Sequence, residues 1–494
     1  MKKSRKVKLT ITCVVLFIII TCGVFFGTQY FTKTGIFKIP GVVYYDSSLS
    51  EDENNLLRSI FTEDVVLDKD VVITATNYLT KPTLKSTDFL VSIRVPVTDF
   101  YSLLSDVTVS DVNQLLSEDF LKENTLSLIN VDDLSFNHKL VSINGNYYLD
   151  SFEKGGVFRV ISFSSEAYED EILPLLGDKL NKSFPDKSTV LTFAQTGVTA
   201  LSRGMNSKLY SVGDANYFAE YLKDYLSGFD LTHTSNESSF TDYANSSNIC
   251  SDKRFIDTLT AIGLDIVELT GNHNIDCGDQ AALETIDTYT EKGIKIVGGG
   301  KSATEAAIPL EISQKGNNIT FLAYNLSTGG ATYDDTPGAN QYYEENAIAD
   351  IKAAKERGDF VIVDIQYYEC NAYVATTEDN TCDYAGSSAG DQVGFFRELI
   401  DFGADMVVGT SAHQPQTFEL YGDGVIYYGL GNLFFDQSWW PGTTRSLILS
   451  HYFYKDKLLQ TKVVPTVYDK ELQTKLMDAE TAQWFLGRLI SERP

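Results

Sequence analysis

The sequence predicts an α/β protein whose main part is a layered α/β domain, preceded by a smaller α/β or α+β domain and a membrane anchor. Three observations support this class. The chain has 494 residues, more than one hydrophobic core usually organises. Residues 9–32 form a long uncharged run near the N-terminus. After Lys187, short apolar runs alternate with amphipathic runs, as expected of strands and helices in a largely parallel sheet domain.

The first 32 residues predict a cytoplasmic tail and a membrane anchor. The tail, residues 1–8, carries five basic residues: Lys2, Lys3, Arg5, Lys6 and Lys8. Residues 9–32 are long enough to cross a hydrocarbon core of ~30 Å. Basic residues before this run and acidic sequence after it place the N-terminus in the cytoplasm. We therefore expect a single-pass protein of the cell membrane whose bulk is extracellular.

A cleaved signal peptide is the alternative interpretation of the same residues. No small-residue cleavage site follows the apolar run, which disfavours it. A lipoprotein-type cleavage before Cys22 is also conceivable, although Thr21 is a poor preceding residue.

The chain is acidic, with a formal net charge of −27 at pH 7. Without the five basic residues of the tail, the charge of the remainder falls from −27 to −32. Such a charge disfavours binding to nucleic acid and to anionic membrane surfaces. The net charge does not identify a partner, because an acidic composition often serves only solubility.

Cysteine usage predicts disulfides. Four cysteines follow the predicted anchor: Cys250, Cys277, Cys370 and Cys382. Their even number suits an oxidising compartment, and three pairings are open. Since Cys277 follows Asp276 and Cys370 follows Glu369, one or both bridges would brace loops of the candidate site. A metal site built from these sulfurs is less favoured, because no Cys-x-x-Cys spacing is present.

Two domains are expected after the anchor. Residues 35–186 mix strand-like and helix-like runs and contain no glycine-rich phosphate loop, and their role is unknown. Residues 187–494 form the layered α/β domain. Its strand-like runs are 189–194, 265–269, 294–297, 319–324, 360–365 and 405–409, and its helix-like runs are 215–226, 252–262, 280–289, 344–357 and 392–402. The later runs 417–421, 424–428 and 446–452 predict a second sheet, and 478–490 a closing helix.

Two loops concentrate the polar residues that chemistry needs. Residues 269–276 read Leu-Thr-Gly-Asn-His-Asn-Ile-Asp, and residues 409–416 read Gly-Thr-Ser-Ala-His-Gln-Pro-Gln. Each follows a predicted strand, and loops at the carboxyl ends of strands bind ligands in α/β sheets. The chain has five histidines, two of them in these loops. His273 and His413 are therefore the candidate catalytic residues.

Taken together, the loops resemble those of the bacterial capsule-synthesis CapA family, which is linked to poly-γ-glutamate capsule production. The resemblance covers residues 188–436 and is most specific in the segments GNHNIDCG and AHQPQ…YGLGNLFFD. It implies a fold similar to calcineurin-like metallophosphoesterases. It also implies metal-binding roles for the residues that match the family pattern: Glu237, Asn272, His273 and His413.

Three positions depart from the family pattern. Val198 stands where Asp is expected, Gln366 where a His is expected, and Thr410 where the first His of the last loop is expected. Valine cannot ligate a metal, and Gln and Thr oxygens are weak substitutes for imidazole. An intact two-metal centre, whose ions would lie ~3.5–4 Å apart, is therefore not expected. We expect at most one divalent ion, weakly bound.

Arg203 and Glu369 are the candidates for binding a substrate. Arginine recognises anionic groups bidentately, and Glu369 is placed to substitute for the missing carboxylate. Every candidate also has a purely structural interpretation. His273 could cap the helix that follows it, Glu237 and Arg203 could be solvated, and Glu369 could simply end a strand.

Three functions are compatible with these residues. The first, which we favour, is an accessory role in the synthesis or export of a poly-γ-glutamate-like capsule polymer, with an anionic cell-surface polymer or its synthesis complex as partner. The second is a metal-dependent surface hydrolase of phosphoesters or of polymer amides, in which metal-bound water is the nucleophile. The third is a receptor that binds a ligand without cleaving it. Metal content would separate the hydrolase from the other two.

Overall fold

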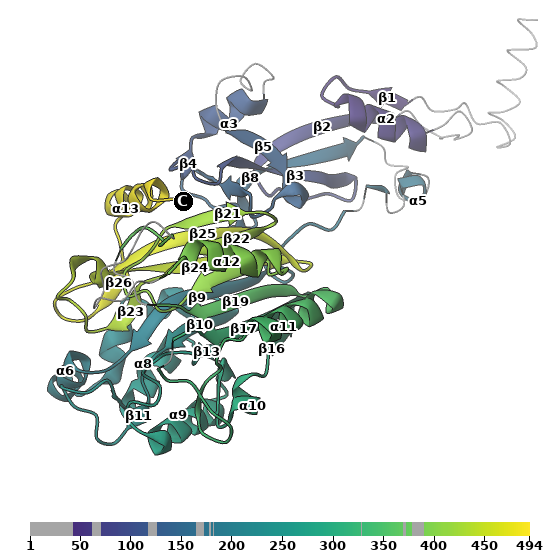
Figure 1. Ribbon diagram of the computed structural model, residues 1–494. Coiled ribbons are helices and arrows are strands. Elements are labelled where there is room, and N and C mark those ends of the chain that lie inside the picture. Colours follow the sequence, from purple (N-terminus) through teal and green to yellow (C-terminus); the bar gives the residue numbers. More distant parts are fainter. Residues whose placement is uncertain are drawn as a thin grey trace, which may run out of the picture.

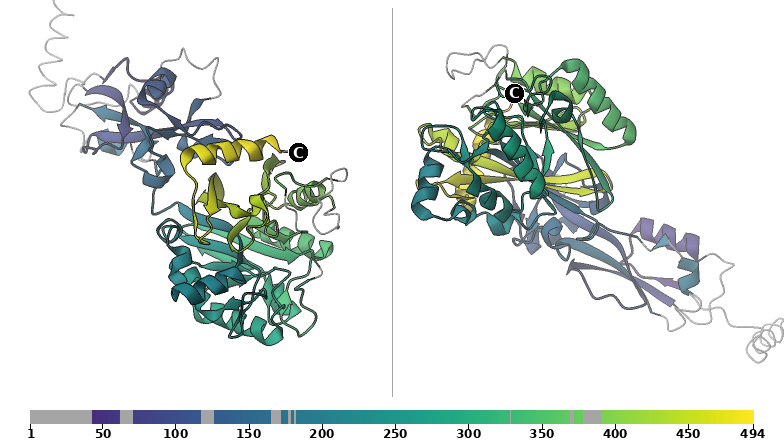
Figure 2. Two further views of the ribbon diagram at one scale, coloured as in Figure 1. Left: turned by 90° about the vertical axis from the view of Figure 1, so that its left-hand side faces the viewer. Right: turned by 90° about the horizontal axis from the view of Figure 1, so that it is seen from below.

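The computed structural model describes residues 43–61, 71–116, 126–164, 172–176, 179–180, 182–327, 329–368, 372–377 and 390–494. Figures 1 and 2 show a smaller body in purple and blue and a larger body in teal, green and yellow. We name them the N-terminal unit, residues 43–180, and the two-sheet unit, residues 182–494. Both combine sheets with helices, so the mixed α/β class expected from the sequence is confirmed.

The N-terminal unit is built on one sheet with the order β1-β2-β8-β3-β5, with β6 beside β3. Its strands are β1 (Val43–Tyr45), β2 (Val71–Thr80), β3 (Asp88–Asp99), β5 (Ser127–Asn130), β6 (His138–Leu140) and β8 (Lys154–Phe163), with a small separate pair β4 (Asp106–Val107) and β7 (Ser142–Ile143). Its helices are α2 (Glu51–Ile60), α3 (Val109–Leu116), α4 (Tyr148–Ser151) and α5 (Leu173–Leu176). Helix α2 begins at a capping box between Ser50 and Glu53, which satisfies two backbone N–H groups.

The first sheet of the two-sheet unit has the order β14-β13-β10-β9-β24-β25-β26, and β23 also pairs with β9. Its strands are β9 (Leu191–Ala200), β10 (Leu231–Asn236), β13 (Ile266–Glu268), β14 (Lys295–Val297), β23 (Asn432–Phe435), β24 (Arg445–Tyr454), β25 (Lys457–Tyr468) and β26 (Thr474–Leu476). Strands β9, β10, β13 and β14 are parallel, whereas β24 runs antiparallel to β9.

The second sheet has the order β16-β17-β19-β20-β22-β21. Its strands are β16 (Leu310–Gln314), β17 (Asn317–Asn325), β19 (Phe360–Gln366), β20 (Met406–Gly409), β21 (Phe418–Tyr421) and β22 (Gly424–Tyr427). The four central strands are parallel, and the edge strands β16 and β21 are antiparallel to their neighbours. Two short pairs lie outside both sheets: β11 (Phe240–Thr241) with β12 (Ser251–Asp252), and β15 (Gly299–Gly300) with β18 (Gly338–Ala339).

The expectation that the strands after residue 416 form a sheet of their own is wrong. Strands β21 and β22 extend the sheet of β19 and β20, whereas β24 joins the other sheet beside β9. The run of residues 446–452 shows only that a strand forms. Which sheet it joins depends on the free edge of β9, because pairing between distant strands is decided by tertiary packing.

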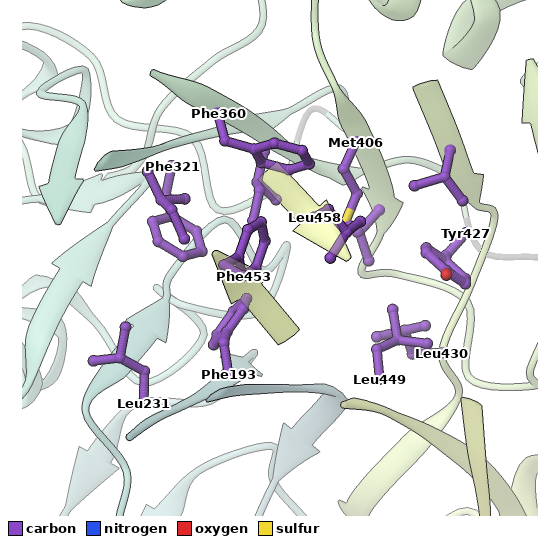
Figure 3. Packing of buried hydrophobic residues seen from close by; sticks show 14 of the residues in the cluster. Phe193, Leu231, Phe321, Phe360, Met406, Tyr427, Leu430, Leu449, Phe453 and Leu458 are labelled. Carbon is purple, nitrogen blue, oxygen red and sulfur yellow. The ribbon is translucent and has the colours of Figure 1, made fainter. Parts of the chain in front are cut away.

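The two sheets face each other across the main hydrophobic core. Phe193 of β9 and Leu449 of β24 share one cluster with Phe321, Phe360 and Met406 of the opposite sheet (Figure 3). Helices cover the outer faces: α6 (Gly204–Val212), α8 (Ile256–Ala261) and α9 (Asp279–Glu291) on the first sheet, and α11 (Glu344–Arg357) and α12 (Gln392–Asp401) on the second. Shorter or peripheral helices are α7 (Lys223–Leu226), α10 (Ala303–Ala306) and α13 (Ala479–Ser491). The unit therefore has four layers, helix, sheet, sheet and helix.

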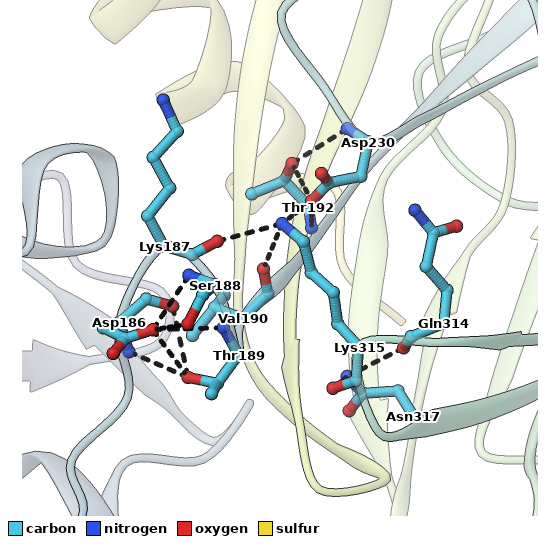
Figure 4. Close-up of polar contacts among 10 residues, drawn as sticks. All are labelled: Asp186, Lys187, Ser188, Thr189, Val190, Thr192, Asp230, Gln314, Lys315 and Asn317. Carbon is cyan, nitrogen blue, oxygen red and sulfur yellow. Dashed lines mark hydrogen bonds and ion pairs between the residues drawn. The ribbon is translucent and has the colours of Figure 1, made fainter.

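A polar cluster fixes the start of β9 (Figure 4). Lys315, in the turn between β16 and β17, donates from Nζ to the backbone oxygens of Lys187 at 3.0 Å and Val190 at 3.1 Å. The same ammonium donates to Asp230 Oδ2 at 2.7 Å. One side chain thus joins the second sheet to the segment that enters the first.

The single-pass membrane location expected from the sequence is not supported. Among the residues that the structure describes, no helix is long and apolar enough to cross a membrane. The helix α11, for example, has 14 residues, and a crossing needs about 20. Residues 1–8 and 9–32, the expected tail and anchor, lie outside the described residues. We therefore withdraw that location.

A disulfide forms between Cys250 and Cys277, as expected from the cysteine count, and it selects one pairing for these two residues. Cys370 and Cys382 lie outside the described residues.

Candidate functional site

The candidate site lies where the carboxyl ends of strands from both sheets meet. In the first sheet β9, β10 and β13 run parallel, as do β19 and β20 in the second. The loops that follow parallel strands share one edge of their sheet. Gln366 at the end of β19 donates from Nε2 to Oε1 of Glu237, directly after β10, at 3.3 Å. This contact joins the loop edges of the two sheets.

Glu237, Gln366 and Asn272 form a polar bridge in which Glu237 and Gln366 are buried and Asn272 is half-buried. Gln366 Nε2 also donates to Asn272 Oδ1 at 3.0 Å. Because both partners present oxygen atoms, the amide nitrogen of Gln366 must face them. Gly271 permits this packing, since a Cβ at that position would lie 2.6 Å from Glu237 Cα. Two of the expected metal-binding residues are thus brought together by the residue that replaces the expected histidine.

His413 is buried and also approaches Glu237. Its Nδ1 lies 2.9 Å from Asn432 Oδ1, while Asn432 Nδ2 donates to Thr443 O at 3.1 Å. Since a backbone carbonyl only accepts, the Asn432 oxygen accepts from His413, and the imidazole carries a proton on Nδ1. His413 Nε2 lies 3.9 Å from Glu237 Oε2. A neutral His413 presents a lone pair there, and a protonated one pairs with the carboxylate.

Arg203 is half-buried and packs on the ring of Phe435, which His413 also approaches. Its backbone has φ 51°, a left-handed conformation that costs a residue other than glycine ~1–3 kcal/mol. Its Nη2 donates to Asp436 O at 3.0 Å, and its Cζ lies 4.5 Å from the Phe435 ring centroid and 4.9 Å from that of Trp439. The Phe435 ring also lies 5.1 Å from the His413 ring. The guanidinium of Arg203 and the buried imidazole of His413 therefore both lie near the Phe435 ring.

His273 lies beside Asp276, whereas the sequence analysis gave it a metal-binding role with Glu237, Asn272 and His413. Its Nδ1 lies 2.7 Å from Asp276 Oδ2, and its side chain is 25% exposed. The disulfide at Cys277 follows this pair directly and braces the loop. Glu369, the second expected substrate-binding residue, lies outside the described residues.

The three positions that depart from the family pattern do not supply substitute ligands. Val198 is fully buried in a small apolar cluster with Ala200 and Phe435. Thr410 is buried, and its Oγ1 has no hydrogen-bond partner among the described residues. Gln366 directs an N–H group at the oxygens of Glu237 and Asn272. To bind a cation there, Gln366 would have to present a lone pair instead.

The donor set does not fit a divalent ion in this arrangement. Within the described part of the chain, no three His, Cys, Asp or Glu side chains gather in a way that could hold a metal. The amide N–H group of Gln366 already bonds Glu237 Oε1 and Asn272 Oδ1, two of the oxygens that were expected to bind the ion. The expected weakly bound ion on Glu237, Asn272, His273 and His413 is therefore not supported by these contacts, and we derive no step through a metal.

The sequence analysis missed a buried polar cluster between the sheets. Asp364 of β19 accepts from Gln195 Nε2 of β9 at 2.6 Å and lies 3.3 Å from His233 Nε2 of β10. Glu268 of β13 is also fully buried and accepts from the backbone N–H of Thr270 at 2.6 Å. The available signal was a charged residue inside an apolar strand run, as in Ile-Val-Glu268-Leu and Val-Ile-Val-Asp364-Ile.

The electrostatics of this cluster are dominated by burial. Burial, together with the negative charges of Asp364 and Glu237, raises the pKa of Glu268 to about 8. Hydrogen bonds from Ser235 and from the Thr270 backbone act in the opposite direction. At neutral pH the Glu268 carboxyl is therefore mostly protonated, and it avoids a second negative charge beside Asp364.

Residues 191–437 match the family model described as bacterial capsule synthesis protein PGA_cap. The chain is 25% identical over 306 residues to the PGA biosynthesis protein CapA of Bacillus subtilis, covering 61% of this chain and 73% of that protein. It is also 25% identical to the capsule biosynthesis protein CapA of Bacillus anthracis, over 38% of this chain and 44% of that protein. A probable polyglutamine synthesis accessory protein of Mycobacterium tuberculosis is 27% identical over 36% of this chain and 47% of its own length.

Among solved structures, the NAD nucleotidase of Haemophilus influenzae aligns with 62% of this chain and 57% of its own. The TM-score is 0.31 and the identity 10%, values too low to transfer a fold or an activity.

Proposed function

The chain belongs to the bacterial capsule synthesis protein PGA_cap family, and on this premise we propose that it assists the synthesis of an anionic capsule polymer of the poly-γ-glutamate kind. Its relatives are named for PGA and capsule biosynthesis. We further propose that the site binds carboxylate groups of the polymer without cleaving it. The partner is then the polymer itself, alone or within its synthesis complex.

The observation that carries this proposal is the arrangement of Arg203. A guanidinium in a strained backbone conformation, stacked between Phe435 and Trp439, is preorganised to meet a planar anionic group. Trp439 is 61% exposed, so the stack reaches solvent. A carboxylate beside Arg203 lies close to the ring of Phe435, which His413 also contacts.

A binding role also agrees with the chemistry of the buried residues. Hydrolysis of an amide or phosphoester needs an activated water or side-chain nucleophile. Here the Glu237 carboxylate and the Asn272 amide are engaged by Gln366, and His413 is anchored by Asn432. These contacts support a rigid surface for recognition.

The overall charge of the chain opposes polymer binding at long range. A formal charge of −27 repels a polyanion. This repulsion is screened beyond a Debye length of ~8 Å at physiological ionic strength, whereas a direct contact with Arg203 is not. Binding should therefore be local and of modest affinity.

The test is fluorescence anisotropy of a labelled poly-γ-glutamate oligomer titrated with the full chain. Arg203→Gln should weaken binding by roughly tenfold, the value of one charge-assisted contact. Arg254→Gln is the matched control, because Arg254 also stacks on an aromatic ring, Tyr210, at 5.1 Å. Equal loss in both variants, or no binding by the natural chain, would contradict the proposal.

A second arm addresses hydrolysis. The oligomer and a model phosphodiester are incubated with the full chain and added Mn²⁺ or Zn²⁺. No cleavage is expected. Metal-dependent cleavage that disappears in Glu237→Gln would replace the binding role with the hydrolase function.

A further inference from the structure

A cavity of about 340 Å³ lies between the N-terminal unit and the two-sheet unit, apart from the site described above. Its floor is formed by β25, and its walls by β6 and the segment before β4. Helix α13 contributes Leu486 and Ile490. Figures 1 and 2 show α13 at the junction of the two bodies. Cavities of this size are at the lower end of those that bind small organic ligands.

The contacts around the cavity hold the two units together. Gln460 of β25 donates from Nε2 to His138 O at 2.9 Å and accepts from the backbone N–H of Leu140. Tyr101 OH accepts from the backbone N–H of Leu420 at 2.8 Å. Phe100 packs edge to face on Phe418, with ring centroids 5.9 Å apart. The cavity is therefore preformed by the junction.

Helix α13 closes one side of the cavity at close range. A Cβ at Gly487 would lie 3.2 Å from Cδ1 of Leu103, so a glycine at this position lets the helix approach the N-terminal unit. The side chains of Leu103, Leu486 and Phe418 give this part of the cavity an apolar wall.

Two carboxylates and two cations line the cavity, and one of the cations is Lys139. Its ammonium donates to the backbone oxygen of Ser102 at 2.5 Å, and among the described residues no carboxylate forms an ion pair with it. Burial alone lowers the pKa of Lys139 to about 8, so the group stays mostly protonated at neutral pH. A cation that is partly desolvated without an anionic partner is unfavourable.

Of the other charged groups that line the cavity, Asp150 and Lys462 pair with each other, whereas Asp106 is held by hydrogen bonds alone. Asp150 accepts from Tyr452 OH at 2.5 Å and pairs with Lys462 at 3.6 Å, and Lys462 also lies 4.9 Å from the Tyr147 ring centroid. Asp106 accepts from Ser142 Oγ at 2.6 Å and from the Gly145 N–H at 2.8 Å. Lys139 is thus the lining cation, among those described, that has no carboxylate partner.

We propose that this cavity binds a small organic carboxylate, whose carboxylate group pairs with Lys139 while its hydrocarbon part lies against the wall of Leu103, Phe418 and Leu486. A single unpaired ammonium next to an apolar surface selects a monoanion with an apolar body. The site is separate from the polymer site, so it does not depend on the proposed function.

The test compares octanoate with 1-octanol, two eight-carbon ligands that differ in charge, by isothermal titration calorimetry on the full chain. Octanoate should bind at least tenfold more tightly than octanol. Lys139→Met should remove that difference and leave octanol binding unchanged. Lys462→Met is the matched control and should alter octanoate affinity by less than about threefold, because Lys462 already has Asp150 as partner.

Two further measurements keep the test decisive if Lys139→Met folds poorly. In the natural chain, octanoate should slow acetylation of the Lys139 amine, followed by peptide mass spectrometry, more than that of Lys462. Ser105→Trp, at an exposed position on the cavity rim, should reduce the binding of both ligands. Equal affinity for octanoate and octanol in the natural chain, or unchanged octanoate binding in Lys139→Met, would overturn the proposal.

Discussion

Replacing Glu268 with Gln should change how stability depends on pH. Glu268 is fully buried, and burial together with the charge of Asp364 raises its pKa to about 8. In the unfolded chain the carboxyl has its ordinary value of 4.5. Between these values the folded state holds a proton that the unfolded state has lost. The stability that this proton contributes is therefore complete below pH ~4.5 and is lost as the pH rises through about 8.

The magnitude follows from linkage. One proton changes the free energy of unfolding by about 1.4 kcal/mol per pH unit within this window. From pH 5 to pH 7, natural protein should therefore lose about 2.7 kcal/mol through Glu268 alone. Glu268→Gln does not titrate, and its amide oxygen can still accept from the Thr270 N–H. The stability of the variant relative to the natural chain should rise by that amount over the same interval.

The assay is urea denaturation of both proteins at pH 5, 6, 7, 8 and 9, with the difference in free energy plotted against pH. The difference should climb to about pH 8 and then level off. Glu291→Gln, at an exposed position of α9, is the control and should give a flat difference. A Glu268→Gln difference that stays constant from pH 5 to pH 8 would refute the reasoning.

Three other predictions concern contacts that hold the site and the fold. Cys250→Ser or Cys277→Ser should lower the free energy of unfolding by about 3.5 kcal/mol, because the disulfide closes a loop with a sequence separation of 27. Urea denaturation without reductant measures this loss, and a loss below about 1 kcal/mol would contradict the prediction. Asn432→Leu should leave His413 Nδ1 buried without its acceptor and cost about 1–3 kcal/mol, visible as a lower urea midpoint. Lys315→Met should cost a similar amount and increase hydrogen exchange at the start of β9, and unchanged exchange there would show that the cluster does not fix this strand.

The strand runs after Lys187 were predictable because apolar residues dominate them. Runs such as residues 360–365 and 405–409 coincide closely with β19 and β20. The helical runs at 280–289 and 344–357 likewise match α9 and α11. The distribution of the later strands between two sheets was not predictable, since β24 pairs with β9 across about 250 residues of sequence.

The candidate site was predictable in part. The loops that carry Glu237, Asn272 and His413 do meet at one edge, as the carboxyl ends of their strands imply. The sequence could not show that Gln366 would bond two of the expected ligands to each other. It also could not show that His273 turns to Asp276, because side-chain direction within a loop depends on its surroundings.

The sequence by itself determined the mixed α/β class, the family and the loop residues at the candidate site. These properties follow from local patterns of hydrophobicity and from short motifs, which can be recognised without knowledge of the fold. Only the tertiary structure decided that Asp364, His233 and Glu268 form a buried polar cluster, and that Lys139 faces a cavity without a carboxylate partner. Such features arise when residues from distant strands come together, as Gln195 and Asp364 do at 2.6 Å and His233 and Asp364 at 3.3 Å. Burial then sets their protonation and their need for partners.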